Sequence, residues 1–115
     1  MKEVKAGIND RNQVFLEGTI RGTPRYSVSP GSGKGCLNVT IDQLKYIGGE
    51  KRYFSVDVVL FEPMSEMYKS VLRDGMFIST EGHIISQDIA ITVGEETKTV
   101  KTMKSVISFL QYEEN

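Results

Sequence analysis

Tyrosines and basic residues gather on both sides of one glycine pair in this chain. Lys45 and Tyr46 precede Gly48-Gly49, and the run Lys51-Arg52-Tyr53 follows it. Tyrosine rings can stack on flat unsaturated groups, and cationic side chains can pair with phosphates. This combination is typical of a surface that binds a polyanion whose units carry aromatic bases.

The charge of the chain is distributed unevenly around a formal net charge of −1. Residues 21–52 carry six basic side chains against two acidic ones, a balance of +4, whereas residues 53–96 carry eight acidic against two basic, a balance of −6. A total near zero argues against a protein that holds nucleic acid through bulk charge, so any such binding must use a local groove. The basic candidates for that groove are Arg21, Arg25, Lys34, Lys45, Lys51 and Arg52.

The aromatic candidates are Tyr46, Tyr53 and Phe61, and each has a second interpretation that the sequence leaves open. Tyr46 and Tyr53 flank a turn, where cross-strand pairing of the rings would simply steady a hairpin. Phe61 could lie in the core at one end of a barrel, beside a helix. The basic pair Lys51-Arg52 could equally be a solvated hairpin end.

Three further lysines are weaker candidates for the same groove. Lys98, Lys101 and Lys104 follow one another at a spacing of three. Because side chains alternate between the two faces of a strand, this spacing cannot keep all three on one face.

Neither catalysis nor a metal or cofactor site is indicated. The one histidine, His83, stands in a strand pattern without a cluster of cysteines or carboxylates at ligand spacing, which favours a structural role. The glycines at 31, 33 and 35 lack the following helix and the Lys-Ser/Thr ending of a phosphate-binding loop. We therefore expect a non-enzymatic protein with no metal and no cofactor.

The chain carries no pattern that would place it in or across a membrane. The N-terminal residues lack the apolar core of a signal peptide, and no apolar run approaches the roughly 18 residues of a membrane span. The single Cys36 excludes an intramolecular disulfide and suits a reducing compartment. We expect a cytoplasmic protein with no membrane partner.

Alternation of apolar and polar residues predicts the strands that must position the candidate groups. The expected strand segments are 12–22, 36–46, 51–61, 76–87 and 88–112, the last with a turn at residues 94–96. The phase of the final strand slips between Val100 and Ile107, which indicates a β-bulge. The glycine- and serine-rich residues 27–35 predict a loop.

One short amphipathic segment interrupts the strands. Pro63 suits a first helical turn and Gly75 the position just past a helix end. The apolar stripe expected to face the sheet is Met64, Met67, Tyr68, Val71 and Leu72. A five-stranded Greek-key barrel of the oligonucleotide/oligosaccharide-binding type, the OB-fold, has one short α-helix between strands 3 and 4 that closes a barrel end. The order of elements therefore predicts an all-β OB-fold barrel.

Several of these segments also resemble the bacterial single-stranded DNA-binding protein family. Ordered matches to the family motifs span about residues 12–110: Asn12, Val14, Leu16, Gly18 and Pro24, then Asn38, Thr40 and Ile41, then Val58, Val59 and Phe61, then Gly75, Glu81 and Gly82. The resemblance implies an OB-fold domain at 12–112, between an N-terminal arm at 1–11 and a short end at 113–115. It also implies a homotetramer or dimer that binds single-stranded DNA without sequence preference in replication, recombination or repair, with other replication proteins as candidate partners.

Three departures from the family pattern bear on function. The family stacks bases on tryptophans and this chain has none, since Ile47, Ser55 and Ile89 stand at about the aligned positions. Asp57 stands where a basic residue is frequent and would repel phosphate. The sequence also ends without the family's glycine- and proline-rich tail and its acidic tip. These departures favour an alternative, an OB-fold protein-interaction module of the primosomal or replication-accessory type with weak or no single-strand binding.

Overall fold

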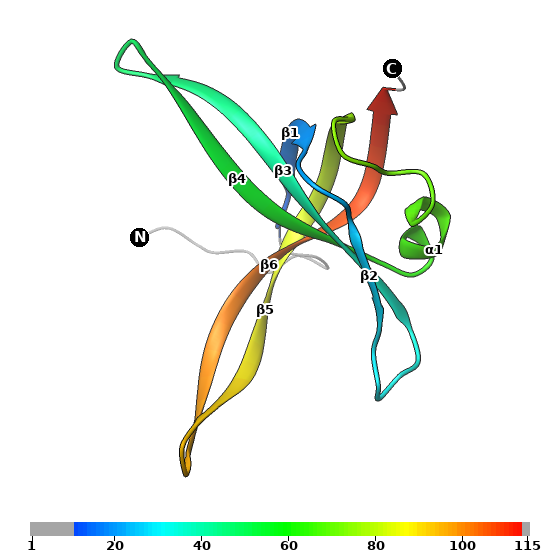
Figure 1. Cartoon of the computed structure of the whole chain (residues 1–115), viewed down its shortest axis with the longest axis vertical. Helices are drawn as coiled ribbons and strands as arrows, with labels where there is room; N and C mark the ends of the chain where they lie inside the picture. Colours follow the sequence, from blue (N-terminus) through cyan, green and yellow to red (C-terminus); the bar gives the residue numbers. More distant parts are fainter. Residues whose placement is uncertain (1–10, 114–115) are drawn as a thin grey trace, which may run out of the picture.

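Residues 11–113, which the computed structural model describes, form six β-strands and one short helix (Figure 1). The elements are β1 (Val14–Ile20), β2 (Arg25–Val28), β3 (Gly35–Ile47), β4 (Glu50–Phe61), α1 (Met64–Tyr68), β5 (Phe77–Val93) and β6 (Glu96–Glu113). No helix within this range is long and apolar enough to cross a membrane. The expected N-terminal arm at 1–11 lies almost entirely outside the described residues, as does most of the expected end at 113–115.

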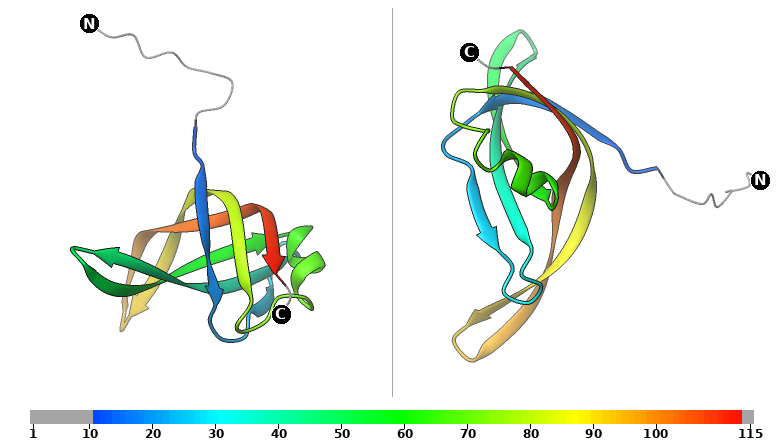
Figure 2. Two further views of the ribbon diagram at one scale, coloured as in Figure 1. Left: turned by 90° about the horizontal axis from the view of Figure 1, so that it is seen from above. Right: turned by 90° about the vertical axis from the view of Figure 1, so that its right-hand side faces the viewer.

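Five of the strands close into a barrel (Figure 2). β1 pairs with both β3 and β5, β5 pairs with β6, and β4 pairs with β3 on one side and with β6, in parallel, on the other. The short β2 adds to the edge of β3. Because α1 follows β4 and precedes β5, the helix lies between the third and fourth barrel strands, as the sequence predicts.

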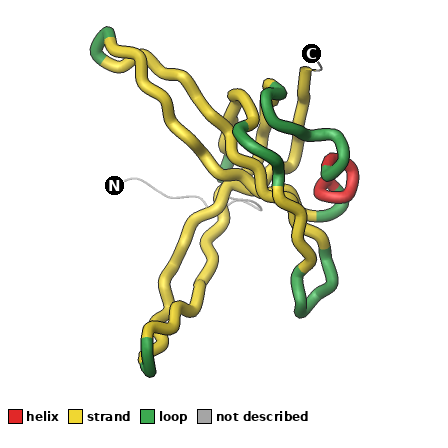
Figure 3. The backbone as a smooth tube through the Cα atoms, viewed as in Figure 1, coloured by secondary structure: helices red, strands yellow, loops and turns green. Residues whose placement is uncertain are grey.

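Two long hairpins extend beyond the barrel, β3–β4 in one direction and β5–β6 in another (Figure 3). The β3–β4 ladder runs to the pair Ile47 and Glu50, which leaves Gly48 and Gly49 as a two-residue turn. Their φ angles are 60° and 81°, the positive values that a type I′ hairpin turn requires. The glycine pair seen in the sequence therefore makes the tight turn of this hairpin.

The core lies inside the barrel and is filled from alternate strand positions. Leu37, Val39 and Ile41 point inward from β3, while Val58 and Leu60 do so from β4, with the period of two expected of a strand. The remaining fully or nearly buried members of this core are Ile20, Leu72, Met76, Ile78, Ile107 and Leu110. Burial of these side chains is the main favourable contribution to folding.

The predicted loop over residues 27–35 is too long. Ser27 and Val28 complete β2 and pair with Cys36 and Gly35 at the start of β3. All four residues of β2 are exposed, and a strand of four residues is too short for the alternation of Tyr26 and Val28 to distinguish it from a loop.

The helix is also shorter than the sequence indicates, because it ends at Tyr68 rather than just before Gly75. Turn hydrogen bonds follow it, including Val71 N–H to Tyr68 O at 3.0 Å. Within this single helical turn Met67 is 60% exposed, so its expected place in the inward stripe is wrong. Leu72 is nevertheless buried, because the irregular segment after the helix carries it into the core.

The bulge expected in the last strand is present at Ser108, one residue beyond the expected range. Glu81 pairs with Phe109 and Gly82 pairs with Ile107, so Ser108 has no partner of its own in the ladder. Its hydroxyl donates to the carbonyl oxygen of Glu81 at 3.2 Å. Such a bulge increases the local bend of the strand, which helps β6 to reach both β5 and β4.

A polar cluster fastens α1 to β2. The Tyr26 hydroxyl donates to Glu66, and Lys69 Nζ lies 2.6 Å from Glu66 Oε2 and 4.6 Å from the Tyr26 ring centroid. The hydrogen bond from Lys69, and then that from Tyr26, lowers the pKa of Glu66 below its ordinary 4.5. The hydrogen bond that Tyr26 donates to Glu66 raises the pKa of Tyr26 above its ordinary 10.0. The contribution of this cluster to the stability of the fold is therefore complete between pH 4.5 and pH 10.0, the ordinary pKa values of the two groups. It is lost as pH falls through the lowered pKa of Glu66, and also as pH rises through the raised pKa of Tyr26.

Candidate nucleic-acid interface

One side of the β3–β4 ladder faces away from the core. Because Leu37, Val39 and Ile41 point inward, the even-numbered residues of β3 point outward, and the register places the odd-numbered residues of β4 beside them. We call this surface the outer face. Its members are Asn38, Thr40, Asp42, Leu44 and Tyr46 on β3, and Lys51, Tyr53, Ser55, Asp57, Val59 and Phe61 on β4.

Tyr46 and Tyr53 lie on the outer face near the tip of the hairpin. Tyr46 is opposite Lys51 and Tyr53 is opposite Leu44, so the two rings are diagonal neighbours on the same side. Each tyrosine is 69% exposed, and the two rings do not form an aromatic pair with each other. Lys51 Nζ lies 5.9 Å from the centroid of the Tyr53 ring. The structure thus joins two accessible rings and one cation on one surface.

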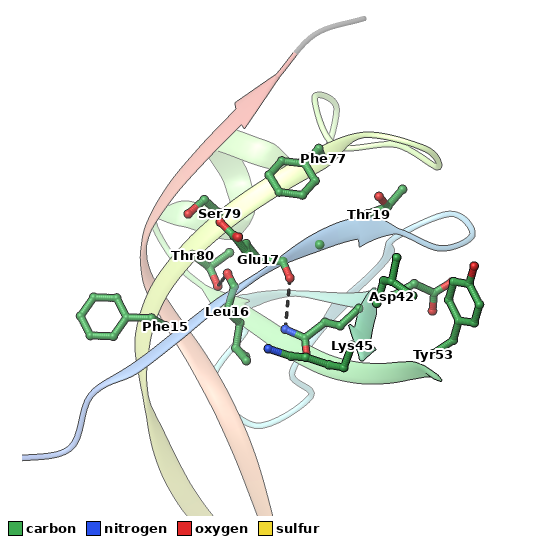
Figure 4. Close-up of a pocket in the computed structure, with 13 residues that line it drawn as sticks. Phe15, Leu16, Glu17, Thr19, Asp42, Lys45, Tyr53, Phe77, Ser79 and Thr80 are labelled. Atoms are coloured by element: carbon green, nitrogen blue, oxygen red, sulfur yellow. Dashed lines mark hydrogen bonds between the residues drawn. The ribbon is translucent and has the colours of Figure 1, made fainter. Parts of the chain in front are cut away.

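Lys45 and Arg52 lie on the other side of the same hairpin. They are directly opposite each other in the ladder, one position out of phase with Tyr46 and Lys51. Arg52 Nη2 pairs with Glu50 Oε2 at 3.2 Å. Lys45 lines a hollow of about 770 Å³ together with residues of β1 and β5, and Tyr53 lines the same hollow (Figure 4). Lys45 therefore shares a hollow with Tyr53, whereas Arg52 does not line it and is paired with Glu50.

The other sequence-predicted residues are spread along the outer face and its margin. Arg21 Nε pairs with Asp42 Oδ2 at 3.0 Å. Arg25 on β2 is opposite Asn38, so the outer face continues onto β2 at this point. Phe61 lies at the end of β4 opposite Cys36 and is partly exposed, while Lys34 is exposed in the turn between β2 and β3.

A second, smaller hollow of about 210 Å³ contains residues that sequence reasoning did not assign to the site. Its lining joins β2, β3 and β4 to β6: Arg25, Asn38, Thr40, Asp57, Val58, Val59, Met103 and Lys104. Val59 is opposite Val106 in the parallel β4–β6 ladder, and Lys104 shares the strand face of Val106. The register places Lys98 on that same strand face and Lys101, opposite Asp88, on the other.

The charges near the outer face are partly compensated. Asp42 accepts a hydrogen bond from Ser55 Oγ at 2.7 Å besides its ion pair with Arg21. Asp57 accepts one from Thr40 Oγ1, also at 2.7 Å. The remaining cations of this surface, Arg25, Lys51 and Lys104, form no ion pair with any other residue between 11 and 113. They are therefore available to an external anion.

No acidic or histidine-containing group among the described residues has the composition of a metal site. The outer face offers aromatic rings, hydroxyl groups, cations and the carboxylates of Asp42 and Asp57. Aromatic rings can stack on bases, and cations can contact phosphate.

The closed five-stranded barrel with its helix at the third-to-fourth strand connection defines this protein as an OB-fold. The chain is similar to the crystal structure of the single-stranded DNA-binding protein from Thermus aquaticus, with a TM-score of 0.73 and 24% sequence identity over 90% of this chain and 50% of that one. A deletion variant of the same Thermus aquaticus protein gives a TM-score of 0.71 and 25% identity, covering 90% of this chain and 51% of the other.

These comparisons confirm, at the level of the fold, the resemblance that the sequence motifs indicate. The chain spans about half the length of the solved proteins that it matches. No protein-family model matches it, and no curated protein matches it.

Proposed function

We propose that this protein binds single-stranded DNA without enzymatic activity, acting in replication, recombination or repair in the cytoplasm. The observation that carries the proposal is the pair of exposed rings, Tyr46 and Tyr53, beside Lys51 on an OB-fold barrel similar to that of a single-stranded DNA-binding protein. Stacking on such rings tolerates any sequence because every base has a flat face. In this proposal the two tyrosines replace the tryptophans that the family uses.

The proposed path of the strand runs along the outer face from the hairpin tip toward β6. Lys51 at the tip and Arg25 and Lys104 around the smaller hollow would each contact a phosphate. Lys34, at the margin, and Phe61, near the helix, would extend the path. Arg52 would contact the strand only if it wrapped around the hairpin, because it projects from the other side. Lys45 would be reached through the hollow that it shares with Tyr53.

Strand binding should weaken as salt rises. With about three phosphate contacts per barrel, the logarithm of the association constant should fall against the logarithm of salt concentration with a slope of about −2. The measurement is a fluorescence-anisotropy titration with oligothymidine of about 12 nucleotides, a length that one barrel can cover. Lys104→Ala should reduce the slope by about 0.7, because one phosphate contact is lost.

Lys101→Ala is the matched control, since this lysine lies on the same strand but on the opposite face. It should leave the slope unchanged. Equal effects of the two substitutions would contradict the proposed path, and no detectable binding at low salt would reject strand binding itself.

The absence of strand binding at low salt would support the alternative, a protein-docking OB-fold module. Two observations favour it: the chain lacks tryptophan, and Asp42 and Asp57 both lie on the outer face, where they would repel phosphate. Against it stands the availability of Arg25, Lys51 and Lys104 on or beside the same surface.

We further propose that the protein is a homo-oligomer, a tetramer or a dimer, that associates through the outside of β1, β5 and β6. This sheet face carries three exposed phenylalanines: Phe15, Phe77 and Phe109. Phe15 and Phe109 both adjoin Glu81 in the ladder, so the two rings flank one position of β5. Exposed aromatic side chains grouped on one sheet are typical of a surface that is covered in the assembled protein.

Sedimentation-velocity analysis tests the oligomer. At a protein concentration of tens of micromolar we expect a mass two or four times that of one chain. The substitution Phe109→Glu should shift the measured mass toward that of the monomer, because association would bury the new carboxylate at the interface. Val28→Glu, which alters an exposed apolar residue on β2, should not change the mass. A monomeric wild-type protein would reject this part of the proposal.

A further inference from the structure

The carboxylate of Asp57 is held in place and has one unused oxygen. Thr40 Oγ1 donates to its Oδ1 at 2.7 Å, which fixes the carboxylate against β3. Its Oδ2 has no hydrogen-bond or ion-pair partner within the described part of the chain. The sequence suggests that Asp57 merely repels phosphate, but this geometry leaves one acceptor for a ligand that offers a hydrogen.

The hollow around Asp57 has the character of a pocket for one flat ring. Its volume is about 210 Å³, against about 30 Å³ for each water molecule in the liquid. Val59 lines the hollow but is only 1% exposed, so the accessible apolar contact comes from the flexible Met103, which is 69% exposed. Arg25 and Lys104 line the same hollow and can hold the phosphates on either side of a ring. A base can therefore meet Asp57 while its phosphates meet the two cations.

Such an arrangement distinguishes bases by the edge that they present. A carboxylate can accept a hydrogen bond from the exocyclic amino group of cytosine. Uracil and thymine carry a carbonyl oxygen at the same ring position. That oxygen and the carboxylate are both hydrogen-bond acceptors, so no hydrogen bond can form between them. A polar group left facing an unsuitable partner loses binding free energy.

We propose that the hollow around Asp57 accepts one base of the bound strand and selects cytosine over uracil or thymine. This inference rests on the proposed single-strand binding. It adds a preference at one position to binding that is otherwise tolerant of sequence, because stacking on Tyr46 and Tyr53 does not depend on the base edge.

The test compares oligodeoxycytidine with oligodeoxyuridine of about 12 nucleotides, in anisotropy titrations at low and moderate salt. These strands differ at the ring edge and not by a methyl group. The wild-type protein should bind the cytidine strand about tenfold more tightly, at the lower end of the discrimination from one base contact. This ratio should persist as salt rises, because phosphate contacts are common to both strands.

Asp57→Asn should reduce the ratio to about one, since an amide can donate to a carbonyl or accept from an amino group. Asp88→Asn, which removes the same charge from the β5–β6 hairpin opposite Lys101, should keep the tenfold ratio. Equal wild-type affinities, or a ratio that survives Asp57→Asn, would overturn the inference while leaving single-strand binding intact. Failure to bind either strand at low salt would instead overturn the proposed function and this inference with it.

Discussion

Replacing both Tyr46 and Tyr53 with alanine is expected to weaken single-strand binding by at least thirtyfold. Stacking on an aromatic side chain contributes about 1–3 kcal/mol per base, so the loss of two rings should cost about 2–6 kcal/mol. Both side chains are 69% exposed and pack against no core residue, so the stability of the fold should change little. The measurement is an anisotropy titration paired with urea unfolding of the same variants.

Tyr68→Ala is the control with the opposite expectation. Tyr68 packs partly buried against the core, with its ring 6.3 Å from that of Tyr112 in an edge-on arrangement. Its loss should lower the free energy of unfolding by about 2 kcal/mol and leave strand affinity unchanged. If Tyr68→Ala weakened binding as much as the double substitution at unchanged stability, the assignment of binding and core faces would be wrong.

Gly82→Ala is expected to destabilise the barrel by about 3 kcal/mol or more. A Cβ atom at this position would lie 1.8 Å from the carbonyl oxygen of Val106 and 3.0 Å from Cα of Ile107. Both neighbours are backbone atoms of β6, so the ladder beside the bulge would have to move to admit a methyl group. Urea unfolding should show a lower midpoint.

Gly31→Ala provides the comparison within the same chain. A Cβ atom at Gly31 meets nothing within 4 Å, and its φ is not in the left-handed region. Alanine should be neutral there or stabilising by a few tenths of a kcal/mol, because it restricts the unfolded chain. If Gly82→Ala and Gly31→Ala lowered the free energy of unfolding by similar amounts, the close approach of β5 and β6 at Gly82 would not be what limits stability.

The strand pattern, the hairpin turn and the fold class could be predicted from the sequence because each depends on short-range chemistry. Alternation with a period of two assigns Leu37, Val39 and Ile41 to the core whatever lies across the barrel. Two adjacent glycines permit the positive φ angles of a tight hairpin. The same period of two also separates Lys51 from Arg52, a distinction that grouping the residues by type had overlooked.

The composition of the site depended on long-range pairing. Asp57 and Lys104 line one hollow only because β6 runs parallel to β4 after passing along β5, a register set by barrel closure and by the bulge at Ser108. The exposed β2 is only four residues long, too short to be predicted from its pattern, and its pairing with β3 brings Arg25 to the same place. The predicted helix was too long because the irregular segment after Tyr68 places Leu72 in the core, so no further helical turn is needed to bury it.

By itself, the sequence determined which residues alternate into the core, where the chain turns, and that aromatic and basic groups occur near one hairpin. Only the tertiary structure decided which of those groups share a surface and that Asp57 lies in a hollow between Arg25 and Lys104. The physical reason is that side-chain alternation and turn chemistry act over a few residues, whereas the closure of a barrel fixes contacts between strands that no local pattern specifies.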